Sequence, residues 1–206
     1  MNIVFCGFSG KTGSILYKEL EKTHTVYKVD INNPLEKEIS KADIVIDFTN
    51  KKACFKHALI CAKYKIPFIS GSTGLNDLEL EQIDAAFKKA KTSAFICSNF
   101  SLGMNYLIKD ISHYSFYDDI LIYETHHKSK LDTPSGTSLL LKKSLNKDVP
   151  IVSKRKNSYE VIHEIALNNE FEELIITHKV KNKKAYYLLL LKAIKEANTF
   201  IGLKTN

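Results

Sequence analysis

The first half of the chain alternates short apolar runs with stretches in which apolar residues recur at helical spacing. An apolar run at residues 2–6 leads through a glycine-containing turn into a helical pattern at residues 15–20. Parallel strands need a crossover connection, usually a helix, so this alternation predicts a doubly wound parallel sheet. The later expected strands, each with the helix that follows it, are residues 44–48 and 51–63, 68–70 and 76–90, and 94–97 and 104–115.

The turn after the first run contains Gly7, Gly10 and Gly13. Glycine permits a tight turn and lets a pyrophosphate approach the backbone, so that the anion lies at the N-terminus of the next helix. The spacing is GxxGxxG rather than the commoner GxGxxG, and an ordinary strand-to-helix turn is the alternative interpretation.

A second β-like run at residues 25–29 ends at Asp30. This position is about 20 residues downstream of the glycine turn, where an acidic residue binds the ribose hydroxyls of a dinucleotide. A carboxylate repels a 2′-phosphate, so we expect NADH to be preferred. NADPH remains possible because Lys11 and Lys28 lie nearby in the sequence.

Small and polar residues follow three of the expected strands, at residues 47–49, 71–74 and 98–101. In doubly wound sheets the ligand binds outside the carboxyl ends of the strands. Each loop taken singly is explained equally well as a turn. Together with the glycine turn they predict a cofactor crevice in a Rossmann-type α/β domain.

The pattern changes in the second half, where β-like runs follow one another at residues 120–126, 161–166 and 174–180. A helix is expected at residues 135–146 and another at 185–197. Consecutive strands of this kind predict a smaller α+β domain with a mixed or antiparallel sheet. We therefore divide the chain into a dinucleotide-binding domain, residues 1–101 with 184–206, and a substrate-binding and oligomerisation domain, residues 102–183.

The segment 124–137 carries two histidines, two lysines and an expected helix start. Ser135 is a favoured N-cap residue, and the free N–H groups and positive end of a helix hold a carboxylate or phosphate. The hydroxyls of Ser135 and Thr137 add donors. His126 and Lys130 lie upstream as cations or proton donors that can act on the bound anion.

The formal net charge is +7 and the sequence pI is about 9.0. Duplex-reading proteins rely on arginine, and Arg155 is the single arginine of the chain, so a small polyanionic ligand is favoured over nucleic acid. Cys6, Cys54, Cys61 and Cys97 show no metal-ligand spacing, which favours reduced, buried thiols and no metal. No apolar run is long enough to span a membrane and no basic leader is evident, so a cytoplasmic location is expected.

Six motifs follow one another in order over nearly the whole chain. They are Gly7-x-x-Gly10-x-x-Gly13, Asp47-Phe48-Thr49, Gly71-Ser72-Thr73-Gly74, Ser98-Asn99-Phe100-Ser101-x-Gly103-x-Asn105, Glu124-x-His126-His127-x-x-Lys130-x-Asp132-x-Pro134-Ser135-Gly136-Thr137 and Ile176-Thr177-His178-Lys179. Taken together, these motifs resemble 4-hydroxy-tetrahydrodipicolinate reductase, also called dihydrodipicolinate reductase. The resemblance implies an NAD(P)H-dependent oxidoreductase of lysine and diaminopimelate biosynthesis that reduces 4-hydroxy-tetrahydrodipicolinate to tetrahydrodipicolinate. It also implies a homo-oligomer, the family tetramer.

The resemblance also assigns roles to individual residues. His126 and Lys130 are the catalytic pair, and His127, Ser135, Gly136 and Thr137 contact the substrate. No metal is implied. The implied cofactor contacts are Gly7, Phe8, Ser9, Gly10, Lys11, Thr12, Asp30, Gly71, Ser72, Thr73, Cys97, Ser98, Asn99 and Phe100.

The chain is an unusually short member of such a family. On the resemblance, shortening falls between Asp30 and Asp47 and between Arg155 and His163, and Ile31 stands where the family has an arginine. The shortening motivates an alternative, a catalytically inactive nucleotide-binding sensor or scaffold of the same fold. Another dinucleotide-dependent dehydrogenase and a basic nucleic-acid-binding module are lesser alternatives, and a steep salt dependence of oligonucleotide affinity would mark the last.

Overall fold

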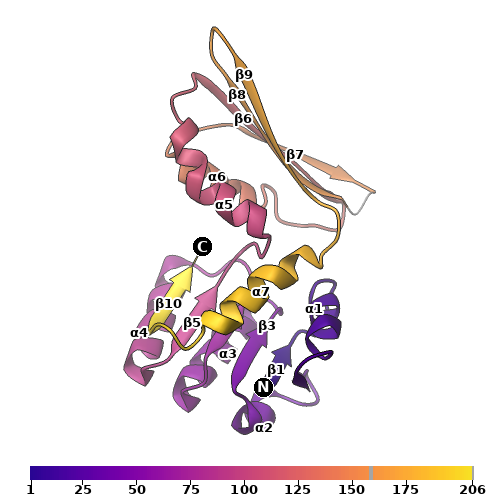
Figure 1. Ribbon diagram of the computed structural model, residues 1–206, viewed down its shortest axis with the longest axis vertical. Coiled ribbons are helices and arrows are strands. Elements are labelled where there is room, and N and C mark those ends of the chain that lie inside the picture. The colour runs from indigo at the N-terminus through magenta and orange to yellow at the C-terminus, as the bar shows by residue number, and fades with distance from the viewer. Residues whose placement is uncertain (158–159, 206) are drawn as a thin grey trace. The chain divides into compact units, whose positions relative to one another are not determined.

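The computed structural model describes residues 1–157 and 160–205, which form two compact units. The first unit comprises residues 1–100 and 186–206, and the second comprises residues 101–185 (Figure 1). The chain therefore leaves the first unit after its fifth strand and returns to it for its last helix and strand. The expected shortening between Arg155 and His163 includes residues 158 and 159, which lie outside the described residues.

The first unit is built on a six-stranded parallel sheet with the strand order β10-β5-β4-β3-β1-β2. Its central strands are buried on both faces, as is usual for a parallel sheet covered by helices. This arrangement confirms the predicted Rossmann-type fold. The strands are β1 (Asn2–Cys6), β2 (Thr25–Val29), β3 (Ile44–Asp47), β4 (Phe68–Ser70), β5 (Ser93–Ile96) and β10 (Gly202–Thr205).

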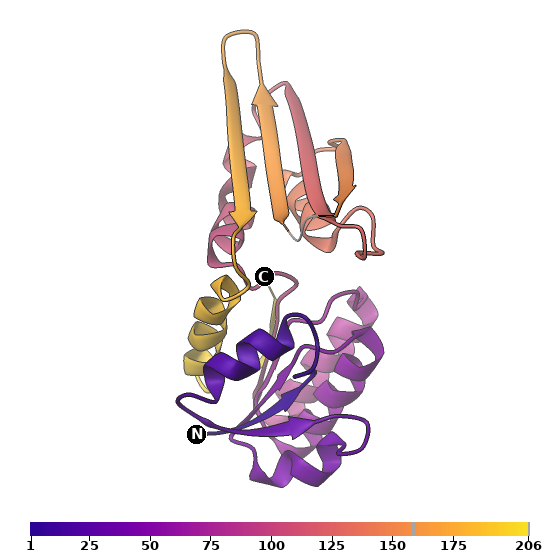
Figure 2. The same cartoon turned by 90° about the vertical axis from the view of Figure 1, so that its right-hand side faces the viewer.

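Helices cover both faces of this sheet. Two of them, α1 (Gly13–Leu20) and α7 (Ala185–Glu196), lie on one face, where Tyr187 Oη donates to the Glu19 carbonyl at 3.4 Å (Figure 2). The opposite face packs against α2 (Leu35–Glu38), the 3-10 helix η1 (Ile39–Lys41), α3 (Lys51–Tyr64) and α4 (Asp77–Ala90).

The bounds of α3 and α4 follow from local chemistry. The Asn50 side chain accepts the Ala53 N–H at the start of α3, and Asn76 forms a capping box with Glu79 at the start of α4. Both helices end at a lysine in the left-handed region, Lys65 with φ 59° and Lys91 with φ 53°. These caps satisfy backbone groups that a helix end leaves without partners.

The second unit has a four-stranded mixed sheet with the order β7-β6-β8-β9. The β6–β8 and β8–β9 pairs are antiparallel, whereas β6 and β7 are parallel, and this confirms the predicted mixed sheet. The elements are α5 (Leu102–Asp110), the 3-10 helix η2 (Ile111–Tyr114), β6 (Asp119–His127), α6 (Gly136–Leu145), β7 (Ile151–Lys156), β8 (Val161–Asn168) and β9 (Glu173–Val180).

One face of this sheet is covered by α5 and α6 (Figure 1). Met104 and Ile108 of α5 and Leu141 and Leu145 of α6 pack against buried aliphatic residues of β6 and β8. Because side chains alternate across a strand, the residues of β6 that share this face include Ile120, Ile122, Glu124 and His126. Polar groups thus continue the row of core side chains at the carboxyl end of β6.

The expected strands and helices are confirmed, with bounds shifted by at most two residues in all but one case. The helix predicted at residues 104–115 is wrong at its end, since α5 stops at Asp110 and the chain tightens into η2. The prediction omitted β7, β10 and the short α2. Both omitted strands lie at a sheet edge, where the pattern is only partly apolar. Among the described residues, no helix is long and apolar enough to cross a membrane.

Candidate active site

The glycine turn after β1 is shaped by close backbone contacts. Gly7 has φ +84°, and a Cβ placed on it would come within 2.5 Å of the Phe48 carbonyl oxygen. The Gly10 N–H donates to the Gly7 carbonyl at 3.1 Å, which closes the turn. The first turn of α1 contains no acidic residue. The turn therefore has the tight geometry and the positive helix end that a dinucleotide pyrophosphate requires.

Asp47 holds together two of the loops predicted to contact the cofactor. It is fully buried, and its Oδ1 accepts the Thr49 N–H at 3.0 Å, the Thr49 hydroxyl at 2.8 Å and the Ser72 hydroxyl at 2.8 Å. Its Oδ2 lies 2.7 Å from Nδ1 of His57 on α3. The loops after β3 and β4 are thus tied to one carboxylate. Sequence reasoning included Asp47 in a motif but did not foresee this role.

The loop after β5 joins the same group of loops. The rings of Phe48 and Phe100 lie 5.2 Å apart, and Cys97 Sγ donates to the Asn99 carbonyl at 2.9 Å. The predicted gathering of loops at the carboxyl ends of β1, β3, β4 and β5 is therefore present.

Asp30 lies at the end of β2 with an exposed side chain. Its Oδ1 accepts the backbone N–H groups of Asn32 and Asn33, both at 2.9 Å. The next residue, Ile31, is 97% exposed. The carboxylate is thus held by the following turn at the exposed end of the strand.

Glu124 is a fully buried carboxylate at the centre of the second unit. Its Oε2 accepts the Ser135 N–H at 3.0 Å and the Ser138 hydroxyl at 2.7 Å, and its Oε1 lies 3.0 Å from Nη1 of Arg155. Burial alone raises the pKa of a carboxyl group, but hydrogen bonds from Ser135 and Ser138 outweigh burial and lower the pKa of Glu124 to about 2. The side chain is therefore an ionised anchor that joins β6, β7 and the start of α6.

His126 lies two residues further along β6 and is 7% exposed. Its Nδ1 is 3.7 Å from Glu124 Oε2, beyond hydrogen-bond distance, and its ring meets that of His163 edge to face at 5.2 Å. Burial lowers the pKa of His126, although the nearby Glu124 carboxylate opposes the shift. His126 is therefore a neutral imidazole at physiological pH.

Two further histidines extend this row across the sheet. His163 on β8 is paired in register with Glu124 and with His178 on β9. Burial, with a smaller effect of His126, lowers the pKa of His163 to about 3, and burial also lowers the pKa of His178. His178 Nε2 lies 2.7 Å from Ser101 Oγ. Sequence reasoning did not identify His163 as part of the site, because only the strand register brings it to Glu124.

Lys130 lies in the loop between β6 and α6. Its Nζ is 2.8 Å from Asp132 Oδ2, with 31% of the lysine side chain and 52% of the aspartate side chain exposed. Burial raises the pKa of Asp132, but the ion pair with Lys130 and a hydrogen bond from the backbone of Gly136 outweigh it and lower the pKa. Lys130 is thus ion-paired and partly exposed, in contrast to the buried His126.

The predicted N-cap is present, since Ser135 Oγ accepts the Ser138 N–H at 3.3 Å at the start of α6. Ser135 is 1% exposed, and its hydroxyl also lies 3.0 Å from Ser138 Oγ and 3.4 Å from His163 Nε2. Gly136 is more accessible, because a Cβ built on it would meet nothing within 4 Å. His127 Nδ1 accepts the Ser129 N–H at 3.1 Å. Ser135 therefore caps α6 from a buried position, and open space remains beside Gly136.

Within residues 1–157 and 160–205, two clusters have the composition of a metal site: Cys6 and Asp47 with the partly buried His57, and the buried Glu124, His126 and His163. In both clusters the carboxylate already accepts several hydrogen bonds. The guanidinium of Arg155 also lies against Glu124, and a fixed positive charge opposes a divalent cation. The expectation of no metal stays a prediction.

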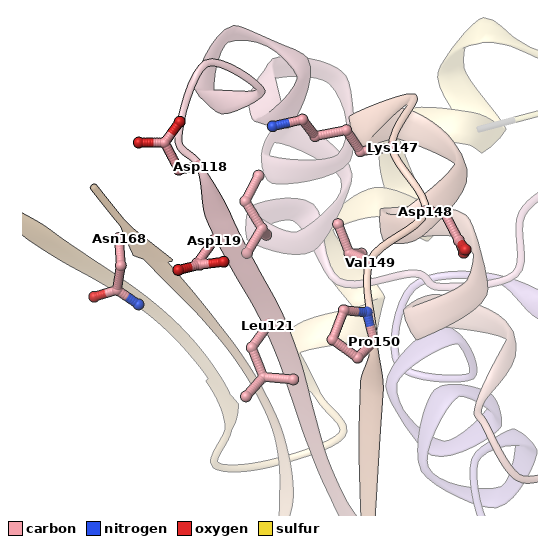
Figure 3. A pocket seen from close by; sticks show the side chains of 9 residues that line it. Asp118, Asp119, Leu121, Lys147, Asp148, Val149, Pro150 and Asn168 are labelled. Carbon is pink, nitrogen blue, oxygen red and sulfur yellow. The ribbon is translucent and has the colours of Figure 1, made fainter. Parts of the chain in front are cut away.

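A hollow of about 460 Å³ lies elsewhere in the second unit, at the start of β6 (Figure 3). His126 and His127 are at the opposite end of the same strand. The hollow is therefore separate from the candidate active site. Its lining consists of Asp118, Asp119, Ile120, Leu121, Lys147, Asp148, Val149, Pro150 and Asn168.

Comparison with known proteins identifies the family. Residues 1–100 match the family described as "Dihydrodipicolinate reductase, N-terminus", and residues 103–205 match "Dihydrodipicolinate reductase, C-terminus". This chain belongs to the dihydrodipicolinate reductase family. Apart from Ser101, the two matched segments cover the motif residues on which the resemblance was based.

Individual relatives agree with this placement. The 4-hydroxy-tetrahydrodipicolinate reductase of Thermosipho africanus is 32% identical over 195 residues, covering 92% of this chain and 88% of that protein. The reductase of the same name from Wigglesworthia glossinidia brevipalpis is 34% identical over 188 residues, covering 85% and 70%. The dihydrodipicolinate reductases thus include relatives that this chain matches over most of their length.

Solved structures show the same fold. A dipicolinate-bound dihydrodipicolinate reductase from a Paenisporosarcina species superposes with a TM-score of 0.81 at 19% identity, covering all of this chain and 97% of that one. A probable dehydrogenase from Thermotoga maritima has a TM-score of 0.68 at 12% identity, covering 97% and 89%. The described residues of this chain therefore share the fold of these solved structures.

Proposed function

We propose that this chain catalyses the NAD(P)H-dependent reduction of 4-hydroxy-tetrahydrodipicolinate to tetrahydrodipicolinate, in the biosynthesis of lysine and diaminopimelate. The observation that carries the proposal is the pairing of buried, neutral His126 with ion-paired Lys130 just before the start of α6, in a chain of the dihydrodipicolinate reductase family. In the net reaction the substrate takes up a hydride from NAD(P)H and a proton. The products are tetrahydrodipicolinate, water and NAD(P)⁺.

The first unit has features that fit a bound dinucleotide. When bound, NAD(P)H supplies the hydride. Gly7 allows the approach of the pyrophosphate, and Asp47 fixes the loops that hold Thr49 and Ser72. The residues proposed to contact the cofactor are those predicted from the sequence, namely residues 7–12, 71–73 and 97–100 together with Asp30.

Loss of the hydroxyl group as water leaves a conjugated ring, and hydride addition to that ring leaves an electron-rich intermediate that takes up a proton. We assign proton delivery to Lys130, because its amine is a cation that pairs with Asp132 in the partly exposed loop before the start of α6. Burial keeps His126 neutral, so it serves as a hydrogen-bonding partner and proton acceptor beside the ring. Replacing His126 with alanine is expected to lower kcat while leaving the affinity for NADH nearly unchanged.

The substrate carries two carboxylates. The N–H groups at the start of α6, beside the open space at Gly136, are proposed to bind one of them, with Thr137 and His127 as further contacts. Ser135 is proposed to act on the substrate through the turn that it caps, since its hydroxyl is buried.

We propose that NADH is preferred and that NADPH is also accepted. The support is Asp30, whose carboxylate is exposed at the end of β2, with exposed Ile31 beside it offering no cation for a 2′-phosphate. Comparison of kcat/KM for the two nucleotides tests this, and a several-fold higher value with NADPH would show that the preference is wrong.

The second sheet is proposed to mediate assembly into a homo-oligomer. Its face opposite α5 and α6 carries Tyr123 and Leu121 of β6, Val152 of β7 and Ile175 of β9, of which Val152 is 38% and Ile175 51% exposed. Light scattering of the purified chain gives the oligomeric state.

We also propose that the chain acts in the cytoplasm. Its proposed binding partner is a small dicarboxylate substrate rather than nucleic acid.

A coupled assay tests the activity. Dihydrodipicolinate synthase generates the unstable substrate in place, and absorbance of the reduced nicotinamide is followed with NADH and NADPH in parallel. Oxidation that requires both the synthase and this chain supports the reductase. Nucleotide binding without oxidation would instead support the inactive sensor or scaffold.

A further inference from the structure

Arg155 stands out in a chain that otherwise uses lysine. The sequence contains 30 lysines and arginines, and Arg155 is the single arginine among them. It lies on β7 and is paired in register with His126 on β6. A planar guanidinium offers several donors in a fixed arrangement, which the single nitrogen of lysine does not provide. The position therefore uses a property that is specific to arginine.

The guanidinium makes contacts in two directions. Towards the core, Nη1 lies 3.0 Å from Oε1 of the buried Glu124. Towards the loop between β6 and α6, Nη2 donates to the Asp132 carbonyl at 2.7 Å and to Thr133 Oγ1 at 2.8 Å, and Nε donates to the Lys130 carbonyl at 3.4 Å. The arginine side chain is 19% exposed. One rigid group thus joins a buried anion to the backbone on both sides of Leu131.

The ion pair between Lys130 and Asp132 does not explain how this loop is held. Both side chains are partly exposed, and such surface ion pairs contribute little to the stability of a loop. The contact of Arg155 with Glu124 is better shielded, because that carboxylate is fully buried, and the start of α6 binds the same carboxylate. The loop, through Arg155, and the start of α6 are therefore held by the same carboxylate, that of Glu124.

We propose that Arg155 is a positioning residue for the reaction, which holds Lys130 at a fixed place relative to Glu124 and α6. The proposal rests on the proposed function of Lys130. Arg155 acts through the backbone of the loop and does not itself transfer a proton. Displacement of a reacting group by about 1 Å can lower a rate by about 100-fold, so loosening this loop is expected to act on kcat.

The test compares Arg155→Lys with Lys156→Ala in the full-length chain. In Arg155→Lys the new side chain keeps the positive charge near Glu124 but cannot bind all of the acceptors that the guanidinium binds. Lys156→Ala is the control, because Lys156 is an exposed neighbour on β7. We expect Arg155→Lys to lower kcat by about 10- to 100-fold with an unchanged KM for NADH. Hydrogen exchange should rise in the loop at residues 128–134 and remain unchanged in the first unit. Lys156→Ala should match the wild type in all of these measurements.

A kcat of Arg155→Lys within twofold of wild type, or unchanged exchange in the loop, would overturn the proposal. If Arg155→Lys does not fold, Thr133→Val decides the question, since it removes one acceptor and leaves the contact with Glu124. It is expected to raise loop exchange and lower kcat by a smaller factor, and a wild-type result in both refutes the proposal. If the wild-type chain shows no turnover, the proposed function is refuted instead. The change in hydrogen exchange of the loop in Arg155→Lys then tests by itself whether Arg155 holds the loop in place.

Discussion

Replacement of Glu124 by glutamine is the sharpest test of how the second unit is held together. The pKa of this carboxyl group is about 2, against an ordinary value of 4.5. Since one pKa unit corresponds to about 1.4 kcal/mol, the ionised carboxylate stabilises the folded chain by about 3 kcal/mol at neutral pH. Glutamine also leaves Arg155 without its anionic partner. For a chain of this length the loss corresponds to a fall in Tm of about 6–12 °C.

The pH dependence has a definite sign. A carboxyl group whose pKa is lower in the folded state contributes its full stabilisation above the unfolded value, and the contribution declines as pH falls from 4.5 towards 2. We therefore expect the difference between wild type and Glu124→Gln to be constant at pH 5–8 and to narrow below about 4.5.

Urea unfolding followed by circular dichroism at several pH values measures this difference. Glu164→Gln on β8 is the matched control, because Glu164 is partly exposed and accepts only a long hydrogen bond, 3.4 Å from Thr177 Oγ1. A difference below about 1 kcal/mol for Glu124→Gln, or one that does not depend on pH, would refute the reasoning.

Three further predictions concern turnover and cofactor binding. Lys130→Ala should lower kcat strongly without changing the Kd for NADH, whereas Lys128→Ala, which alters an exposed lysine of the same loop, should leave both near wild type; steady-state kinetics and NADH titration decide. Gly7→Ala should weaken NADH binding by about 100-fold or more, because its Cβ would press on the Phe48 carbonyl, and binding within threefold of wild type would contradict this. Asp47→Asn should raise the KM for NADH more than it lowers kcat, since it loosens two cofactor loops, and an unchanged KM would show that these loops do not depend on the carboxylate.

The features that the sequence predicted well depend on neighbours along the chain. The cap at Ser135, the glycine turn at Gly7 and the strand ending at Asp30 each follow from a few adjacent residues. The gathering of loops at one edge of the first sheet follows from the strand–helix alternation, because parallel strands place their carboxyl ends together.

The features that were missed depend on register and on contacts between distant segments. The β7 segment, with the sequence IVSKRK, carries three basic residues and lacks a clear alternation of apolar and polar residues. Its pattern therefore does not predict a strand. It forms one because β6 offers it a parallel edge. Only that pairing brings Arg155 to Glu124, and only the β6–β8 register brings His163 there. A sequence shows which residues are charged, but the ion-pair partner of Glu124 lies 31 positions away.

The two proposed catalytic groups lie four positions apart, and their surroundings differ. His126 is inside the sheet, where burial disfavours the charged form. Lys130 is beyond the end of the strand, where its partly exposed side chain pairs with Asp132. On the proposed roles, the end of β6 therefore separates the acceptor from the donor, and we expect Glu124 with Arg155 to keep that separation fixed.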